Sequence, residues 1–120
     1  MKILLVEDEE DANRYFRLAL KAEGYDVTGV LSGQDALHAL TEGSFDLMLL
    51  DSRMSGLDGI ETGRKVRETL PADKLPICMI TASMDVEKVV AAFQVGANGY
   101  IVKPFDIDEL LSKIHELTDS

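Results

Sequence analysis

The sequence lacks the features of an extracellular or membrane-spanning protein. It has a single cysteine, Cys78, which cannot form a disulfide within the chain and is typical of a reducing compartment. No apolar run approaches the roughly 20 residues that a membrane helix needs. The short apolar run after Met1 lacks the cleavage site of a signal peptide. We therefore expect a cytoplasmic protein with Cys78 in its core.

Basic residues are also scarce. The chain has 12 Lys and Arg against 22 Asp and Glu, which gives a formal net charge of −10. Such a charge disfavours contacts with nucleic-acid phosphates or with an anionic membrane surface, because both are negatively charged themselves. We expect neither as a partner, and cations or basic partner proteins suit the chain better.

Nothing in the sequence divides the chain into parts. We find no linker, low-complexity tract or internal repeat, and 120 residues is close to the commonest domain size. An apolar fraction of 46% and a charged fraction of 28% are typical of a globular protein. Residues 1–120 are therefore expected to form a single domain.

Short apolar runs alternate with longer segments of helical period. The run at 46–50 is continuously apolar after its first residue, as in a parallel strand that is covered on both faces. Five strand and helix pairs in a row predict an α/β fold, a doubly wound parallel sheet with helices on both faces. The expected strands are 2–6, 26–31, 46–50, 76–80 and 99–102.

Residues that favour helix ends agree with this division. The segment 10–23 places five residues on one expected apolar face: Ala12, Tyr15, Phe16, Ala19 and Leu20. The expected N-caps are Ser32, Asp58 and Asp106, and the expected C-terminal glycines are Gly24, Gly43 and Gly96. We expect Gly56 and Gly59 to serve turn geometry.

Polar residues follow four of the five expected strands. Glu7 and Asp8 follow the first, Asp51 the third, Thr81 the fourth and Lys103 the fifth. In open parallel sheets these carboxyl ends meet at one edge, where the functional crevice lies. Two carboxylates about 4 Å apart repel by about 4 kcal/mol at an effective dielectric near 20, so the acidic group calls for a cation. Oxygen ligands of this kind suit Mg²⁺.

The other two strand ends offer the opposite chemistry. Thr81 supplies a hydroxyl and Lys103 a positive charge, and both groups can hold phosphoryl oxygens. A carboxylate that lies beside a metal and faces such groups can act as the nucleophile in phosphoryl transfer. We expect Glu9, Glu10 and Asp11 to belong to the start of the first helix instead.

Four segments at these strand ends resemble the receiver domain of bacterial two-component response regulators, including chemotaxis response regulators. They are ILLVEDE at 3–9, LLDSRMSGLDG at 49–59, MITA at 79–82 and GANGYIVKPF at 96–105. The resemblance extends over the whole chain. It implies a flavodoxin-like (βα)5 fold with strand order 2-1-3-4-5, and a phosphorylation switch.

The resemblance also implies a role for individual residues. Asp51 is the phosphoacceptor, and Thr81 and Lys103 contact the phosphoryl group, with Thr81 and Tyr100 forming the conformational switch. The resemblance implies that Mg²⁺ is bound by Asp8, Asp51 and the Arg53 backbone carbonyl, and that Glu7 contacts the ion through a water. It also implies that Arg53 and Ser83 modulate the lifetime of the phosphoryl group. The peptide bond before Pro104 is expected to be cis.

The implied partners follow from this switch. A sensor histidine kinase or a histidine phosphotransfer protein would donate the phosphoryl group, and an unidentified protein would read a surface at about 85–95 and 99–117. The chain would be a monomer or a phosphorylation-dependent dimer, and would turn over no separate substrate.

Other functions stay open. One alternative is a receiver-like binding module that works without phosphorylation, although such modules usually lose Asp51, Asp8 or Lys103. Another is a Mg²⁺-dependent aspartyl-phosphate phosphatase, which would need a second Asp where this chain has Arg53. A flavodoxin-like cofactor binder is disfavoured, because the acids after the first strand would repel phosphate.

Some positions depart from the family pattern. Ser55 stands where many receivers have proline. Asn98 and Gly99 replace the paired acids of receivers that dimerise ahead of DNA-binding domains, and Lys113 stands near their arginine. The sequence gives no support to that particular dimer. Since the chain ends at Ser120, we expect a stand-alone receiver or one cut from a larger protein.

Overall fold

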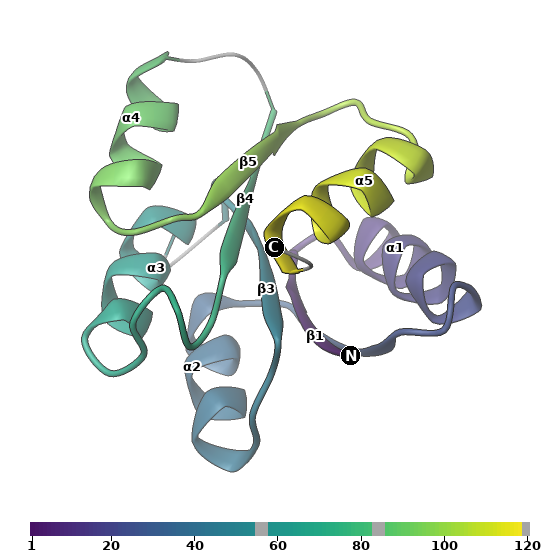
Figure 1. The fold of residues 1–120 in the computed structure, drawn as a ribbon, viewed down its shortest axis with the longest axis horizontal. Coiled ribbons are helices and arrows are strands. Elements are labelled where there is room, and N and C mark those ends of the chain that lie inside the picture. Colours follow the sequence, from purple (N-terminus) through teal and green to yellow (C-terminus); the bar gives the residue numbers. More distant parts are fainter. Residues whose placement is uncertain (55–57, 83–85, 119–120) are drawn as a thin grey trace.

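The structure is a computed structural model and describes residues 1–54, 58–82 and 86–118. Strands and helices alternate along these residues, and Figure 1 shows their arrangement. The elements are β1 (Lys2–Val6), α1 (Glu10–Ala22), β2 (Asp26–Val30), α2 (Gly33–Glu42), β3 (Leu47–Asp51), α3 (Gly59–Arg67), β4 (Ile77–Thr81), α4 (Val86–Gln94), β5 (Gly99–Val102) and α5 (Ile107–Thr118).

All neighbouring strands run parallel, in the order β2-β1-β3-β4-β5. The expected fold class and strand order are therefore confirmed. The register pairs Val6 with Leu50, and Thr81 with Val102. The carboxyl ends of β1, β3, β4 and β5 consequently lie at the same edge of the sheet.

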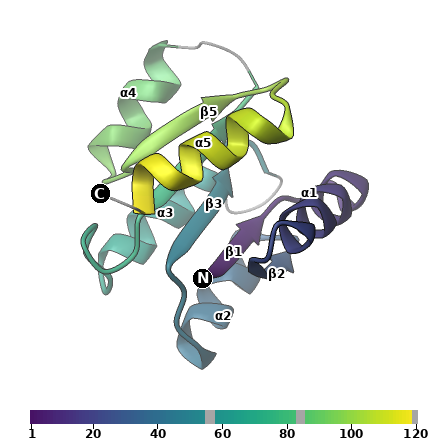
Figure 2. The same cartoon turned by 45° about the vertical axis from the view of Figure 1, so that its right-hand side comes forward.

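Helices cover both faces of this sheet. Figures 1 and 2 show α1 and α5 on one face and α2, α3 and α4 on the other. Alternate residues of one strand serve the two cores: Leu47 and Leu49 pack in the first, and Met48 and Leu50 in the second. Every residue of β3 is buried, which explains why the residues of the strand before Asp51 are continuously apolar. Among the helices of the described ranges, none is long and apolar enough to cross a membrane.

The expected helix N-caps form. Ser32 Oγ accepts a hydrogen bond from the Asp35 N–H at 3.0 Å. Asp58 Oδ1 accepts one from the Glu61 N–H at 2.8 Å, and Asp106 Oδ1 accepts one from the N–H three residues later, also at 2.8 Å. Each cap accepts a hydrogen bond from a backbone N–H that has no partner within its own helix. Such a cap stabilises the helix by about 1 kcal/mol.

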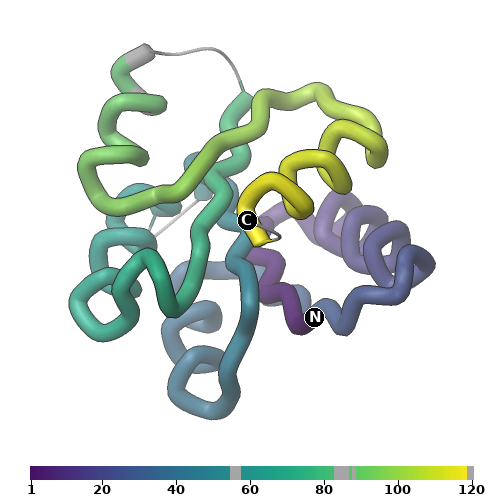
Figure 3. The backbone as a smooth tube through the Cα atoms, viewed as in Figure 1, coloured from purple at the N-terminus to yellow at the C-terminus, as the bar shows by residue number. Residues whose placement is uncertain are grey.

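The expected C-terminal glycines differ in their backbone. Gly24 and Gly96 have φ of 96° and 98°, a region that strongly favours glycine. Gly43 has φ of −161°, an extended conformation that other residues adopt readily. The chain path in Figure 3 turns sharply after α1 and after α4, where the two left-handed glycines lie.

Three of the expected strands had boundaries that were wrong by one residue. β2 ends at Val30, before Leu31. β3 and β4 each begin and end one residue later than expected, so Asp51 and Thr81 are the last residues of their strands. The main-chain ladder continues past the apolar run because it is independent of side-chain polarity: the Ser52 N–H still donates to the Ile80 carbonyl at 2.8 Å.

The expected apolar face of the first helix was also partly wrong. Tyr15 is 62% exposed, whereas Asn13 is buried. Asn13, Phe16 and Leu20 therefore define the inward face of α1, and a polar residue occupies a position that the pattern gave to an aromatic one. Ser55, Gly56, Ser83 and Asp85, which other predictions concern, lie outside the described residues.

Cys78 is the second residue of β4 and is fully buried, as expected. Burial raises the pKa of its thiol from 9.0 to about 12. Because the thiolate is the reactive form, we predict that the folded protein reacts with a thiol reagent at pH 8 about a thousandfold more slowly than the urea-unfolded chain does. The absorbance of the coloured thiolate that the reagent releases measures both rates. Fast, stoichiometric labelling of the folded protein would contradict the prediction.

Candidate functional site

Three carboxylates meet at the carboxyl edge of the sheet. Glu7, Asp8 and Asp51 each offer one oxygen, and these oxygens all lie within 4.8 Å of one another. Glu7 and Asp51 are only 2% and 5% exposed, and Asp8 is half-buried. The pairing of β1 with β3 produces this cluster, because it brings together two strand ends that are far apart in the sequence.

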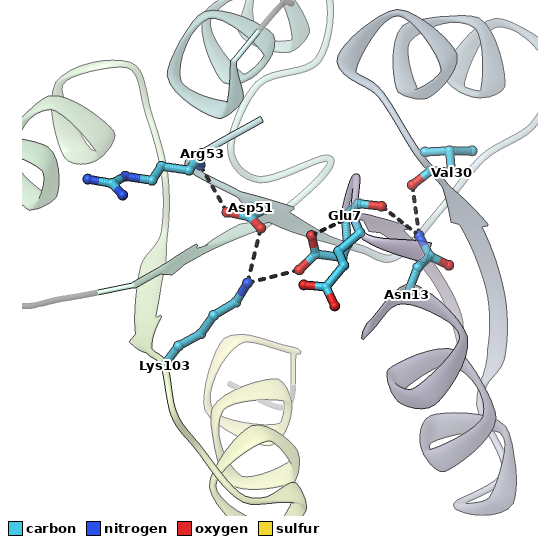
Figure 4. A network of polar contacts seen from close by, with 7 residues as sticks. Glu7, Asn13, Val30, Asp51, Arg53 and Lys103 are labelled. Carbon is cyan, nitrogen blue, oxygen red and sulfur yellow. Dashed lines mark hydrogen bonds and ion pairs between the residues drawn. The ribbon is translucent and has the colours of Figure 1, made fainter. Parts of the chain in front are cut away.

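Lys103 completes the cluster from the end of β5 (Figure 4). Its Nζ lies 2.9 Å from Glu7 Oε1 and 3.1 Å from Asp51 Oδ2. β4 separates β5 from β3, so the lysine side chain crosses the end of β4 to reach Asp51. Within these four described side chains one positive charge faces three negative ones, and the four together carry a net charge of about −2 when all are ionised. That excess of negative charge favours a divalent cation.

The environment shifts the pKa of two of these groups. Burial raises the pKa of Glu7, the nearby charge of Asp51 adds to this effect, and hydrogen bonds from Lys103 and the Glu9 N–H oppose it. Burial alone would lower the pKa of Lys103, but its hydrogen bonds to Glu7 and Asp51 and their negative charges more than offset this, and the pKa is raised. Lys103 is therefore a reliable positive charge at neutral pH.

Different donors hold the two oxygens of Asp51. Oδ1 accepts a hydrogen bond from the Arg53 N–H at 2.9 Å, and Oδ2 pairs with Lys103. The Arg53 side chain is exposed and extends away from Asp51 in Figure 4. Its main chain, rather than its guanidinium, contacts the carboxylate here. The proposed metal contact of the Arg53 carbonyl stays a prediction.

Thr81 and Tyr100 lie on the neighbouring strands. Thr81 is buried at the end of β4, between β3, which ends at Asp51, and β5, which Lys103 follows. Tyr100 is half-buried on β5, and its ring packs edge-on against Phe93 of α4 with centroids 6.0 Å apart. Their switch roles stay predictions, and Ser83 lies outside the described residues.

The segment after β5 is fixed against the first helix. The Lys103–Pro104 peptide bond is cis, the isomer that the resemblance implied. Phe105 follows directly, and its ring stacks on Phe16 of α1 with centroids 5.1 Å apart. This contact ties the loop that carries Lys103 to the helix that follows Glu7 and Asp8. Sequence reasoning missed it, although an aromatic residue in each segment was the available signal.

Gly59, the first residue of α3, lies directly against the phosphoacceptor candidate. A Cβ there would overlap the Asp51 carbonyl oxygen and would lie 2.7 Å from Ser52 Cα. Its φ is not in the left-handed region, so the expected role in turn geometry was wrong. Glycine is required here because the helix start packs closely on the end of β3.

The chain belongs to the response regulator receiver domain family, whose model matches residues 3–115. It is therefore a receiver domain of the kind found in bacterial two-component systems. The transcriptional regulatory protein YkoG of Bacillus subtilis is 42% identical over 112 residues, which cover 93% of this chain and 48% of YkoG. Response regulator ArlR of Staphylococcus saprophyticus is 40% identical over 116 residues, which cover 97% of this chain and 51% of ArlR. The chain thus spans about half the length of these relatives.

Solved structures agree with this family. Response regulator TrrA of Thermotoga maritima, crystallised in complex with Mg²⁺-BeF, superposes with a TM-score of 0.85 at 30% sequence identity. The match covers 97% of each chain.

The donor set of the carboxylate cluster fits Mg²⁺. The ion prefers hard oxygen ligands, and it commonly takes one or two carboxylates and completes its octahedral shell with water and phosphate oxygens. Glu7, Asp8 and Asp51 offer such oxygens at one place, two of them from nearly inaccessible side chains. Binding would also relieve their mutual repulsion.

The Gly59 contact predicts a steric effect on stability. Gly59→Ala should lower the free energy of unfolding by about 1 to 3 kcal/mol, because α3 or the end of β3 must shift to admit the methyl group. Urea denaturation measures the change. Gly43→Ala is the matched control, since nothing lies within 4 Å of a Cβ at Gly43, and it should leave stability almost unchanged. Equal effects of the two substitutions would contradict the steric argument.

The carboxylate cluster predicts stabilisation by Mg²⁺. At about ten times its dissociation constant the ion should raise the free energy of unfolding by about 1.4 kcal/mol, and Tm by about 5 °C. Asp8→Ala should remove most of this gain. Glu10→Gln should keep it, because Glu10 lies in the first turn of α1 outside the cluster. Calorimetric melting with and without Mg²⁺ tests both variants. A wild-type Tm that does not change in millimolar Mg²⁺ would exclude the metal site.

Proposed function

We propose that this receiver domain is a phosphorylation switch in which Asp51 accepts the phosphoryl group. One observation carries the proposal: Asp51 lies among two further carboxylates, and Lys103 bridges it to Glu7. This arrangement offers a nucleophile, a site for a divalent cation and a fixed positive charge within one small volume. The TrrA complex with Mg²⁺-BeF supports the same use of the fold.

The transfer is a displacement at phosphorus. A carboxylate oxygen of Asp51 attacks the phosphorus of a phosphohistidine, so the new O–P bond forms as the N–P bond breaks. The electron pair of the breaking bond stays on the imidazole nitrogen of the donor, which can then take a proton from solvent. Mg²⁺ supplies neutralisation of phosphoryl charge when it is bound. Lys103 contributes a further positive charge beside Asp51.

The phosphoryl group then changes the balance of charge at the sheet edge. It brings about −1.5 to −2 charges and three acceptor oxygens next to Lys103 and Thr81. The Asp51 carboxylate loses its own negative charge as the acyl phosphate forms, so the site gains about one negative charge at most. We propose that Thr81 moves towards these oxygens and that the ring of Tyr100 turns into the space it leaves. Because Tyr100 packs on Phe93, this change would reach α4, where Val90 and Phe93 are 48% and 47% exposed. A partner would read the α4-β5-α5 surface.

The donor is a sensor histidine kinase or a histidine phosphotransfer protein under this proposal. We infer no direct contact with nucleic acid or membrane by this domain, and no turnover of a separate substrate. The names of the relatives support a role in regulation.

The direct test is phosphorylation by a small acyl phosphate with Mg²⁺. Wild-type protein should gain the mass of one phosphoryl group, and Asp51→Asn should gain none, since the amide is not a nucleophile. Asp46→Asn is the matched control, because Asp46 precedes the same strand at its opposite end and should not affect labelling. Intact-mass spectrometry measures all three proteins.

The outcomes separate the possible functions. Equal labelling of Asp51→Asn would exclude Asp51 as the phosphoacceptor. Partner binding that is identical with and without phosphorylation would instead indicate a phosphorylation-independent module. Catalytic release of phosphate from added phosphate esters would indicate a phosphatase.

A further inference from the structure

Asn13 is a buried polar side chain on the inward face of α1, and it is 4% exposed. Its Nδ2 donates two hydrogen bonds, to the Glu7 carbonyl at 3.0 Å and to the Val30 carbonyl at 2.9 Å. Figure 4 shows the amide between these two strand ends. Asn13 therefore joins α1 to the ends of both β1 and β2.

These hydrogen bonds close the turn that carries two of the cluster acids. The turn runs from the end of β1 at Val6 to the start of α1 at Glu10, so it includes Glu7 and Asp8. The Glu7 N–H donates to the same Val30 carbonyl at 3.1 Å. Glu7 is thus held through its N–H by β2 and through its carbonyl by Asn13, which leaves its carboxylate to face Lys103.

β2 leaves room for this arrangement. A Cβ at Gly29 would overlap Asn13 Oδ1 and would lie 3.2 Å from Arg17 Cδ. Gly29 has no left-handed backbone that would require glycine for its own sake. The glycine on β2 and the asparagine on α1 therefore fit together as a pair.

A neutral donor suits this position. Glu7, Asp8 and Glu9 follow one another in the turn, and their mutual repulsion favours a more open turn. An asparagine amide holds the main chain without cancelling the negative charge that a cation needs. An aspartate in its place would turn acceptor oxygens towards two carbonyls and would add a further negative charge.

We propose that Asn13 is a positioning residue of the metal site, which sets Mg²⁺ affinity by fixing the main chain of Glu7 and Asp8. This inference rests on the proposed function. Hydrogen-bond partners that orient metal ligands typically change metal affinity by about 10- to 100-fold when they are removed. We expect an effect in that range from Asn13→Ala.

The test is a calorimetric titration of the full chain with MgCl2. It is run at a temperature where circular dichroism shows every variant to be folded. Asn98→Ala is the matched control, because the Asn98 side chain also takes part in two hydrogen bonds, which its Oδ1 accepts from the Ile77 N–H and from Arg67 Nη2. Asn98 precedes β5, at the opposite edge of the sheet. We expect Mg²⁺ to bind Asn13→Ala at least about tenfold more weakly than wild type, and Asn98→Ala to bind as wild type does.

Gly29→Ala gives a second and independent variant. It keeps the amide but displaces it, and we expect it to weaken Mg²⁺ binding as well. If Asn13→Ala does not fold, the Mg²⁺ affinity of Gly29→Ala tests the inference instead.

Each outcome separates this inference from the proposed function. Wild-type affinity in folded Asn13→Ala, or in Gly29→Ala where the first variant is unfolded, would overturn the inference alone. If Asn98→Ala weakened Mg²⁺ binding as much as Asn13→Ala does, the inference would also be overturned, because the loss of affinity would then reflect a general loss of order in the fold. A wild-type protein that binds no Mg²⁺ would overturn both the metal site and the inference.

Discussion

One lysine, Lys103, partly offsets the repulsion between the carboxylates at the carboxyl edge of the sheet. Lys103 follows β5 and brings its ammonium to the carboxylates of Glu7, which follows β1, and Asp51, which ends β3. Parallel strands lie about 4.8 Å apart, so only a long side chain can cross β4 and make both contacts. Its single charge reduces the repulsion without removing it. The domain can therefore fold with a cluster that is still negative enough to attract a divalent cation.

Besides Lys103, the donors that the described part of the chain gives to Glu7 and Asp51 are neutral. Main-chain N–H groups of Glu9 and Arg53 donate to Glu7 and Asp51, and the Asn13 amide holds the Glu7 carbonyl. Such donors orient carboxylates and favour their ionised form, but they add no net positive charge. A second cationic side chain in the same place would stabilise the resting domain and compete with the metal. The site thus combines geometric order with an uncancelled charge.

The sequence predicted much of this arrangement because strand ends obey a simple rule. Continuously apolar runs marked the parallel strands, and the polar residues after them had to meet at one edge, which brought Glu7, Asp51 and Lys103 together. The strand order came from the resemblance, since periodicity carries no information on which strands pair. Asn13, Gly59 and Phe105 were missed because each acts through contact with a segment distant in sequence or through close backbone packing. No pattern within a single segment records such contacts.

Hydrogen bonds at the opposite edge of the sheet fix the amino ends of β4 and β5, so a structural change that starts at Asp51 would leave these ends in place. Arg67 at the end of α3 donates from Nε to the Gly96 carbonyl at 2.9 Å and from Nη2 to Asn98 Oδ1 at 2.9 Å. The same Asn98 oxygen accepts the Ile77 N–H at 3.0 Å, which joins the starts of β4 and β5. An acid at this position would form an ion pair with Arg67, whereas asparagine accepts the hydrogen bond from the Arg67 cation as a neutral group. With both strands held at their amino ends, a rearrangement of Thr81 would act mainly on the carboxyl edge, and a rearrangement of Tyr100 would act on α4 through its contact with Phe93.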